Sequence, residues 1–384
     1  MPARYVKVPS ALTGESNLKS DAKGKVVVGE STIAKLSKES LPYLPTWDKN
    51  EKYEPYTFQE HHDNALKADK SFPDLFKGDD YVTTNLSPKL GTEIRGIQLS
   101  ELNDAGRDQV ALLASQRGVL VFRDQDLIDK GPENLVEYVS HYGTPHIHPT
   151  SGAPKGHPDI HSVLTGDTKE DAFSTRNNLV VWHSDVSYEL NPTAVSFLAV
   201  TNIPKAGGGD TVFADNREAY NRLSPLFKEK IDNLKAVHSA VDQANLAVVK
   251  GGVVKRHPVE NIHPVVRTTP SGQKVLYVNS GFTRRIVDLK GEESDFLLKF
   301  LLQHIASSQD FQVRVNWQPG TVAIFDNRIV SHSAILDFDT SDGRLIIRAA
   351  ARGERPVHDL EDLNKPDENL VYEGPEYIGN HREV

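Results

Sequence analysis

The sequence predicts a mainly β fold with flanking helices, built around a double-stranded β-helix, or jelly-roll, core. Short runs rich in β-branched and aromatic residues recur between turn signals from Tyr81 onward. Helical patterns and long irregular insertions separate these runs, which suits a jelly roll better than a doubly wound sheet. No glycine-rich nucleotide-binding fingerprint follows any of the runs. The clearest β-type runs are Gly118–Arg123, Val195–Val200, Lys274–Asn279, Thr321–Phe325 and Leu345–Arg348.

Four segments between the β-type runs have the apolar spacing of amphipathic helices. Several of them open on an Asp or Asn, residues whose side chains cap the first turn of a helix. We expect these helices to pack outside the β core. They are Asp104–Gln116, Pro132–Tyr142, Asn216–Asn233 and Glu292–His304.

The chain divides into two parts by composition. Residues 1–80 are polar, rich in Lys, Ser and Pro, and weakly periodic, which predicts an extension that wraps the domain or is partly disordered. We expect no chemistry there. Residues 81–384 form the second part, which we expect to be one domain because large β folds often use a chain of this length.

The composition restricts the classes of function. With 38% hydrophobic and 25% charged residues the chain can bury a full core. The absence of cysteine excludes disulfides, a thiolate nucleophile and cysteine-ligated metals, so any metal must bind His, Asp or Glu. A net charge of -9 without a Lys/Arg block argues against a nucleic-acid partner. We expect a cytoplasmic protein without a membrane partner, because neither a ~20-residue apolar span nor a secretory signal is visible.

A candidate metal site combines two distant motifs. His183 and Asp185 stand two apart in Val181–Val186, so in an extended segment both side chains face the same side. His332 lies 149 residues after His183, just past a predicted strand that could bring it to the pair. Two imidazoles and one carboxylate on one face leave the opposite positions open, as Fe(II) needs to bind a chelating co-substrate and O2 together. Two alternatives stay open: a surface histidine hydrogen-bonded to a carboxylate, and a zinc-dependent hydrolase.

Two arginines follow the last histidine. Arg344 lies twelve residues beyond His332, and Arg348 is four residues further along an apolar run. Both arginines should face the same side of a strand, and we expect them to share one sheet with the metal ligands. If that face is interior, their guanidinium groups would match a carboxylate or sulfonate bidentately. Alternatively, Arg348 faces solvent or pairs with an internal Asp or Glu.

Two further motifs are candidates for ligand binding. Ala206–Thr211 is a glycine-rich turn that leads into a strand, and the hydroxyl of Thr211 could donate to a co-substrate carboxylate. A flexible hairpin loop explains the same glycines. In Pro145–Pro149, strand-like alternation makes only one of His146 and His148 face the site.

Together these motifs resemble the taurine/2-oxoglutarate dioxygenase (TauD/TfdA) family of Fe(II)-dependent oxygenases, and the chain is similar to fungal sulfonate dioxygenases. The similarity extends from Tyr81 to about Pro356 and leaves the N-terminal extension uncovered. The motifs that carry it are Trp182–Val186, Gly208–Thr211, Asp326–Arg328 through His332, His263–Arg267 and Asn279–Thr283.

The resemblance implies a role for each matching residue. It implies that three catalytic residues hold Fe(II): His183, Asp185 and His332. It implies that two residues hold the distal carboxylate of 2-oxoglutarate: Thr211 and Arg344. In sulfonate-oxidising members, residues at four matching positions hold or surround the substrate: His148, Val186, Phe282 and Arg348. Two positions depart from the taurine enzyme, because Ser151 replaces a pocket tyrosine and Leu179 replaces an asparagine near the substrate amine.

The resemblance also implies the reaction. With Fe(II), 2-oxoglutarate and O2, the enzyme would hydroxylate a small taurine-like sulfonate and release sulfite and an aldehyde, together with succinate and CO2. Alkyl sulfate esters, aryloxyalkanoates and xanthine remain alternative substrates for the same chemistry. A reading of another class is a non-catalytic sensor that binds 2-oxoglutarate. Homo-oligomers are usual in the family, so we expect one here.

Overall fold

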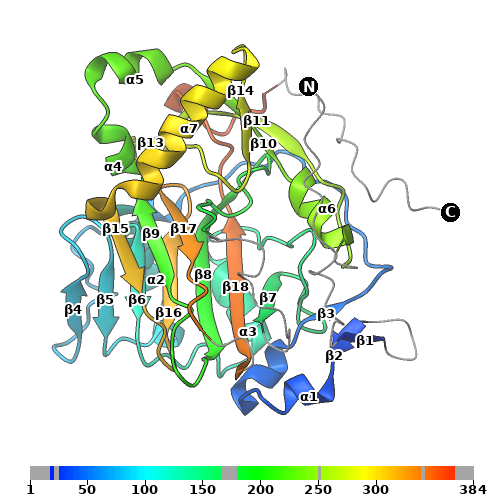
Figure 1. Ribbon diagram of the computed structural model, residues 1–384. Helices are drawn as coiled ribbons and strands as arrows, with labels where there is room; N and C mark the ends of the chain where they lie inside the picture. Colours follow the sequence, from blue (N-terminus) through cyan, green and yellow to red (C-terminus); the bar gives the residue numbers. More distant parts are fainter. Residues whose placement is uncertain (1–17, 21–25, 166–179, 250–251, 339–341, 368–384) are drawn as a thin grey trace.

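Two β-sheets face each other in the computed structural model, which describes residues 18–20, 26–165, 180–249, 252–338 and 342–367 (Figure 1). The larger sheet has the strand order β4-β5-β6-β16-β8-β18-β7, and the smaller sheet has the order β15-β9-β17. The mainly β fold predicted from the sequence is confirmed. The strands of the larger sheet are β4 (Val82–Asn85), β5 (Thr92–Arg95), β6 (Val119–Phe122), β7 (Ile160–Thr165), β8 (Thr193–Asn202), β16 (Val322–Asp326) and β18 (Arg344–Arg352). Those of the smaller sheet are β9 (Thr211–Asp215), β15 (Gln312–Val315) and β17 (Val330–Ala334).

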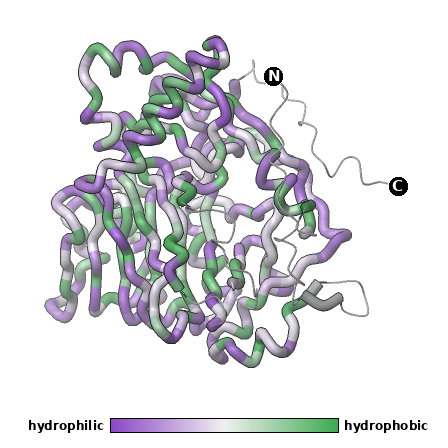
Figure 2. Tube along the Cα trace, viewed as in Figure 1, coloured by the Kyte–Doolittle hydropathy of each residue, from purple (hydrophilic) through white to green (hydrophobic). Residues whose placement is uncertain are grey.

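The central strands of the larger sheet are apolar on both faces because both faces are covered there. In β6, Val119 and Val121 pack between the two sheets, whereas Leu120 and Phe122 pack in the cluster beneath the helices. Alternate residues of a strand point to opposite faces, so a doubly covered strand needs a continuous apolar run. Figure 2 shows the hydrophobic residues along these central strands and hydrophilic residues at the outer turns.

Two helices, α2 (Asp104–Arg117) and α3 (Pro132–Ser140), cover the outer face of the larger sheet. The side chain of Asn103 caps α2 by accepting a hydrogen bond from the amide of Gly106 at 2.8 Å. Gly118 ends the helix at φ +74, a conformation that costs glycine little. Both helices were predicted from the sequence, and α3 ends two residues earlier than expected.

A third group of elements lies above the two sheets in Figure 1 and has its own apolar cluster. The prediction of a single helix over Asn216–Asn233 is wrong, because this segment forms two helices. Pro225 has no amide hydrogen for a continuing helix, and Ser224 caps a new one by accepting from the amide of Phe227 at 3.3 Å. Only the first half of the predicted run Lys274–Asn279 forms a strand. The elements are α4 (Asn216–Asn221), α5 (Pro225–Ile231), α6 (Val241–Val249), α7 (Gly291–Ser307), β10 (Lys235–Ser239), β11 (Glu260–Pro264), β12 (Val266–Thr268), β13 (Lys274–Leu276) and β14 (Thr283–Ile286).

Residues 26–80 pack against the β core. Tyr43 is completely buried and Leu75 nearly so, both in the cluster beneath α2 and α3. The carboxylate of Asp63 lies 2.6 Å from the guanidinium of Arg328, which also binds Asp326. This segment therefore contributes both apolar and ionic contacts to the domain. Its elements include β2 (Val26–Val28), α1 (Glu30–Ile33) and β3 (Thr46–Trp47), and the preceding strand β1 (Leu18–Ser20) pairs with β2.

Within the described ranges, no helix is both long and apolar enough to cross a membrane.

The ion pair between Asp63 and Arg328 is nearly inaccessible to water, since their side chains are 4% and 3% exposed. Replacing Asp63 with Ala leaves part of a buried guanidinium charge unpaired, so we expect the free energy of unfolding to fall by about 3 kcal/mol. Urea denaturation measures this loss. Glu60→Ala, an exposed carboxylate in the same segment, is the matched control and should change stability by less than about 0.5 kcal/mol. Equal stabilities of the two variants would contradict this account of the segment.

Candidate active site

Two of the three predicted metal ligands are joined through their backbones. His183 and His332 form an isolated antiparallel bridge in which the amide of each donates to the carbonyl of the other, at 3.0 and 2.8 Å. His332 lies on β17, so the bridge adds one residue to the smaller sheet. The ligand atoms of His183 and Asp185 face the same side, as predicted, although the chain turns after Ser184 instead of continuing as a strand. Val186 in this turn has φ +46, a costly conformation for a β-branched residue.

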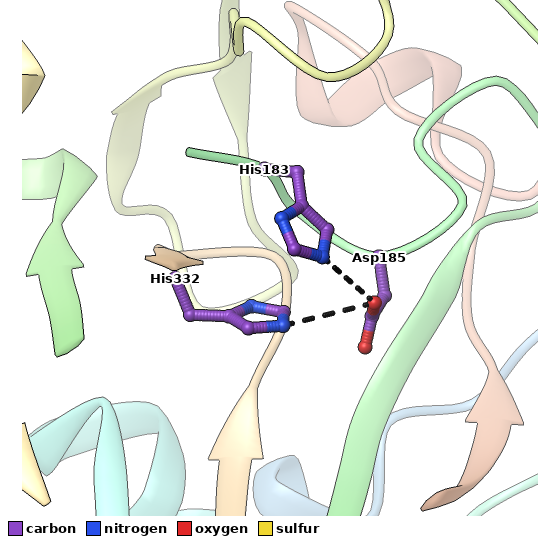
Figure 3. Close-up of side chains that lie close together, drawn as sticks. All are labelled: His183, Asp185 and His332. Carbon is purple, nitrogen blue, oxygen red and sulfur yellow. Dashed lines mark ion pairs between the residues drawn. The ribbon is translucent and has the colours of Figure 1, made fainter. Parts of the chain in front are cut away.

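The three side chains point toward one another (Figure 3). Their ligand atoms all lie within 4.8 Å, and Oδ1 of Asp185 is 3.6 Å from Nε2 of His183 and 3.8 Å from Nε2 of His332. Nδ1 of His183 is 3.0 Å from the carbonyl of Val181, to which it can donate, and this leaves the Nε2 lone pair toward Asp185. Two imidazole nitrogens and a carboxylate at this spacing fit one divalent cation.

The charge states of the triad also fit a cation. Asp185 is 3% exposed, and its Oδ2 atom is buried without a hydrogen-bond partner among the described residues. Burial opposes ionisation of Asp185, but Arg348 and the two histidines outweigh it and hold the pKa well below its usual value. Burial, with His183 adding to it, lowers the pKa of His332 to about 3. A metal therefore finds a carboxylate and a neutral imidazole, the forms that coordinate metals.

Asn327 holds the backbone of Asp185 in place. Its side-chain oxygen accepts from the amide of Asp185 at 2.6 Å, and its side-chain nitrogen donates to the carbonyl of Asp185 at 2.9 Å. The same nitrogen donates to the carbonyl of Thr193 on β8 at 3.0 Å. The Asp-Asn-Arg motif is visible in the sequence, but the role of Asn327 is not, since nothing local to the motif indicates a contact 142 residues away.

A buried cation lies at the start of β18. Arg344 is 2% exposed and donates to the carbonyl of Gly209. The nearby carboxylates of Asp210 and Asp337 are both paired with Arg314 instead. Burial lowers the pKa of Arg344 to about 10, although the two carboxylates act in the opposite direction. The guanidinium therefore has unused capacity for an external anion.

The glycine-rich turn makes room for this guanidinium. A Cβ atom at Gly209 would come within 2.6 Å of Nε of Arg344, and Gly209 has φ +71. The turn leads directly into β9, whose first residue is the buried Thr211. Thr211 belongs to the smaller sheet and Arg344 to the larger one. The expectation that the metal ligands and the arginines share one sheet is wrong, because the site lies between two sheets.

The second arginine reaches the metal triad itself. Arg348 is 7% exposed, and its guanidinium pairs with Oδ1 of Asp185. It lies about 13 Å along the strand from Arg344, at about 3.3 Å per residue. Beside the triad, Val186 and Phe282 belong to one small buried apolar cluster, and the Phe282 ring centroid is 6.1 Å from that of His183. Three of the four predicted substrate residues thus lie beside the triad: Arg348, Val186 and Phe282.

The two histidines before β7 have different surroundings. His146 is 3.1 Å from the carboxylate of Glu189, which also pairs with Arg256, so His146 belongs to a buried ionic cluster. Nδ1 of His148 accepts from the amides of Thr150 and Ser151 at 3.2 and 3.1 Å. Its proton must therefore be on Nε2, which makes His148 a donor. The departure at Leu179 lies outside the described residues.

Comparisons with known proteins agree with the site. A family model described as "Taurine catabolism dioxygenase TauD, TfdA family" matches residues 83–350. An alpha-ketoglutarate-dependent sulfonate dioxygenase of Saccharomyces cerevisiae is 45% identical over 334 residues, covering 85% of this chain and 80% of the yeast protein. The alpha-ketoglutarate-dependent dioxygenase cnsP of Penicillium expansum is 39% identical, with 82% and 86% covered. The crystal structure of a taurine dioxygenase from Burkholderia xenovorans superimposes with a TM-score of 0.58 at 29% identity, over 73% of this chain and 93% of that one.

The two hydrogen bonds between Asn327 and the backbone of Asp185 form a clamp, and its removal should lower the affinity for metal. In Asn327→Ala the backbone of Asp185 loses two hydrogen bonds, and we expect the affinity for Fe(II) or Co(II) to fall about 10- to 100-fold. Anaerobic titration of the metal-free protein with Co(II), followed by its visible absorption, measures the change. Asn64→Ala is the control, because Asn64 is a buried asparagine bonded to Asp108 and His141 instead. Unchanged affinity in Asn327→Ala would show that the clamp does not position Asp185.

Proposed function

This chain belongs to the TauD/TfdA family and is an Fe(II)- and 2-oxoglutarate-dependent dioxygenase, and we propose that it hydroxylates a small sulfonate at the carbon that bears sulfur. One observation carries the substrate proposal: the guanidinium of Arg348 reaches the carboxylate of Asp185. An anion held by Arg348 would thus lie directly beside the metal triad. The yeast relative that acts on sulfonates supports the same class.

In the proposed site, His183, Asp185 and His332 hold Fe(II). Iron, when bound, supplies the redox chemistry that activates O2. Coordination would share the charge of Asp185 with the metal and so free Arg348 for the substrate. Thr211 and Arg344 bind the distal carboxylate of 2-oxoglutarate, and the carboxylates closest to Arg344 among the described residues, Asp210 and Asp337, pair with Arg314 instead.

The proposed substrate lies on the other side of the triad. Arg348 donates to its sulfonate in a bidentate arrangement, and Nε2 of His148 donates a further hydrogen bond. Val186 and Phe282 form an apolar wall that orients the reacting carbon and excludes water. These four residues position the substrate and do not exchange protons with it.

The atoms of the proposed reaction balance. One oxygen atom of O2 enters succinate as 2-oxoglutarate loses CO2, and the other enters the C–H bond next to sulfur. The resulting 1-hydroxysulfonate loses sulfite, and its hydroxyl proton leaves as the carbonyl of the aldehyde forms. The products are succinate, CO2, sulfite and an aldehyde.

Other readings have less support. A 2-oxoglutarate sensor would not need an anion site on each side of the metal triad, and a zinc hydrolase would not need the buried Arg344. Sulfate esters, aryloxyalkanoates and xanthine remain alternative substrates of the same site. We also propose that residues 81–384 form the catalytic domain and that the protein is a cytoplasmic homo-oligomer.

The proposed reaction predicts matched products. With Fe(II), ascorbate, 2-oxoglutarate and a sulfonate in air, we expect succinate and sulfite in equal amounts. Removing the metal with a chelator should abolish both, Fe(II) should restore them, and Zn(II) should inhibit. Assays of succinate and sulfite in the same reaction check this. Succinate without sulfite would reject the sulfonate, and activity with Zn(II) alone would favour the hydrolase.

The two arginines predict a crossed pattern of Michaelis constants. Arg344→Met should raise KM for 2-oxoglutarate about a hundredfold and leave KM for the sulfonate nearly unchanged, because each guanidinium meets a different anion. Arg348→Met should do the reverse. Each variant thus controls for loss of folding in the other. An unchanged KM for the sulfonate in Arg348→Met would refute the proposed grip.

A further inference from the structure

The substrate side of the site contains more nitrogen donors than one sulfonate needs. His161 lies beside Arg348 and His148, and the backbone of Lys255 is bonded to Pro149, next to His148; within the described ranges neither His161 nor Lys255 forms an ion pair. Nδ1 of His161 is buried and without a partner. Lys255 is 1% exposed, which is rare for a lysine outside an ion pair.

His161 is a neighbour of both Arg348 and His148. It lies on β7 directly opposite Arg348 on β18, and its ring centroid is 4.4 Å from that of His148. Burial and the charge of Arg348 lower the pKa of His161 well below its usual value, whereas Asp185 acts in the opposite direction. The imidazole is therefore neutral, close to the arginine, and able to donate one hydrogen bond.

Lys255 is anchored through its backbone next to this group. Its backbone amide donates to the carbonyl of Pro149 at 2.7 Å, next to His148, and its carbonyl accepts from the amide of Tyr53 at 2.8 Å. The positive charge of Lys255 contributes to the low pKa of both His148 and His161, after burial and the nearer cations. Lys255 is thus within electrostatic reach of both rings.

The internal carboxylates near Lys255 do not pair with it. Glu51 accepts a hydrogen bond from the hydroxyl of Tyr53, and Asp159 is partly buried with a pKa raised by that burial. Burial is the largest influence on Lys255 and lowers its pKa, although both carboxylates act in the opposite direction. A buried ammonium without a counter-ion is costly, so the site is suited to an external anion.

We propose that His161 and Lys255 form the far end of the substrate pocket and select sulfonates whose second end is anionic, in preference to aminosulfonates such as taurine. This inference rests on the proposed function. Arg348 and His148 hold the sulfonate, and Lys255, with a hydrogen bond from His161, meets a carboxylate at the other end of the molecule. An ammonium at that end would be repelled.

Three two-carbon sulfonates that differ only in their second end test the proposal: taurine with an ammonium, isethionate with a hydroxyl and sulfoacetate with a carboxylate. Their dissociation constants are measured anaerobically with Fe(II) and 2-oxoglutarate bound, so that no turnover occurs. We expect sulfoacetate to bind most tightly and taurine least tightly, at least about tenfold apart. Lys255→Met should reduce the ratio of the taurine to the sulfoacetate dissociation constant about tenfold. Lys255→Glu should reverse the order of affinities.

Two further variants separate the roles. Lys52→Met is the matched control, because the exposed Lys52 donates to the neighbouring carbonyl of Val254 at 2.8 Å, and it should keep the wild-type order. His161→Phe keeps the ring but removes its donor, and should weaken sulfoacetate binding about tenfold while the affinity for 2-oxoglutarate stays the same.

The outcomes distinguish the two claims. The role of Lys255 would be overturned if the wild type bound taurine more tightly than sulfoacetate. It would also be overturned if Lys255→Met kept the wild-type ratio of the two dissociation constants. Binding in the expected order without sulfite after O2 is admitted would support the pocket and overturn the proposed reaction.

Discussion

The backbone bridge between His183 and His332 is the constraint on which the site depends. Two backbone hydrogen bonds hold His183 against β17. The strand β17 is itself held by its pairing with β9. Asn327 then ties the turn itself, through Asp185, to β8 of the other sheet. Main-chain hydrogen bonds thereby position all three ligands, the two histidines through the smaller sheet and Asp185 through its tie to the larger one.

The charges of the site oppose those of the whole molecule. The chain carries a net charge of -9, yet Arg344 and Arg348 are buried in the site, and Lys255 is buried next to the loop that carries His148. Nearby acids are committed elsewhere, since Asp210 and Asp337 pair with Arg314. Asp185 is the exception, and a metal would share its charge. This charge distribution is the basis for the proposal that the site binds an anion at each side of one cation.

Sequence reasoning found what is encoded locally. The apolar runs of β6, β8, β16 and β18 and the periodicity of α2 are local, and the metal and arginine motifs were recognised by resemblance. What it missed depends on distant partners: the bridge of His183, the clamp of Asn327, and the burial of Lys255 beneath residues near Tyr53. The broken helix at Pro225 is different, because the Ser-Pro signal was present and the apolar periodicity outweighed it.

The most direct test is a crystal structure of the anaerobic complex with Fe(II), 2-oxoglutarate and isethionate. The account predicts iron on His183, Asp185 and His332, the distal carboxylate of 2-oxoglutarate on Arg344, and Arg348 turned from Asp185 to the sulfonate. Iron at another site, or a sulfonate bound away from Arg348 while that arginine still pairs with Asp185, would contradict it.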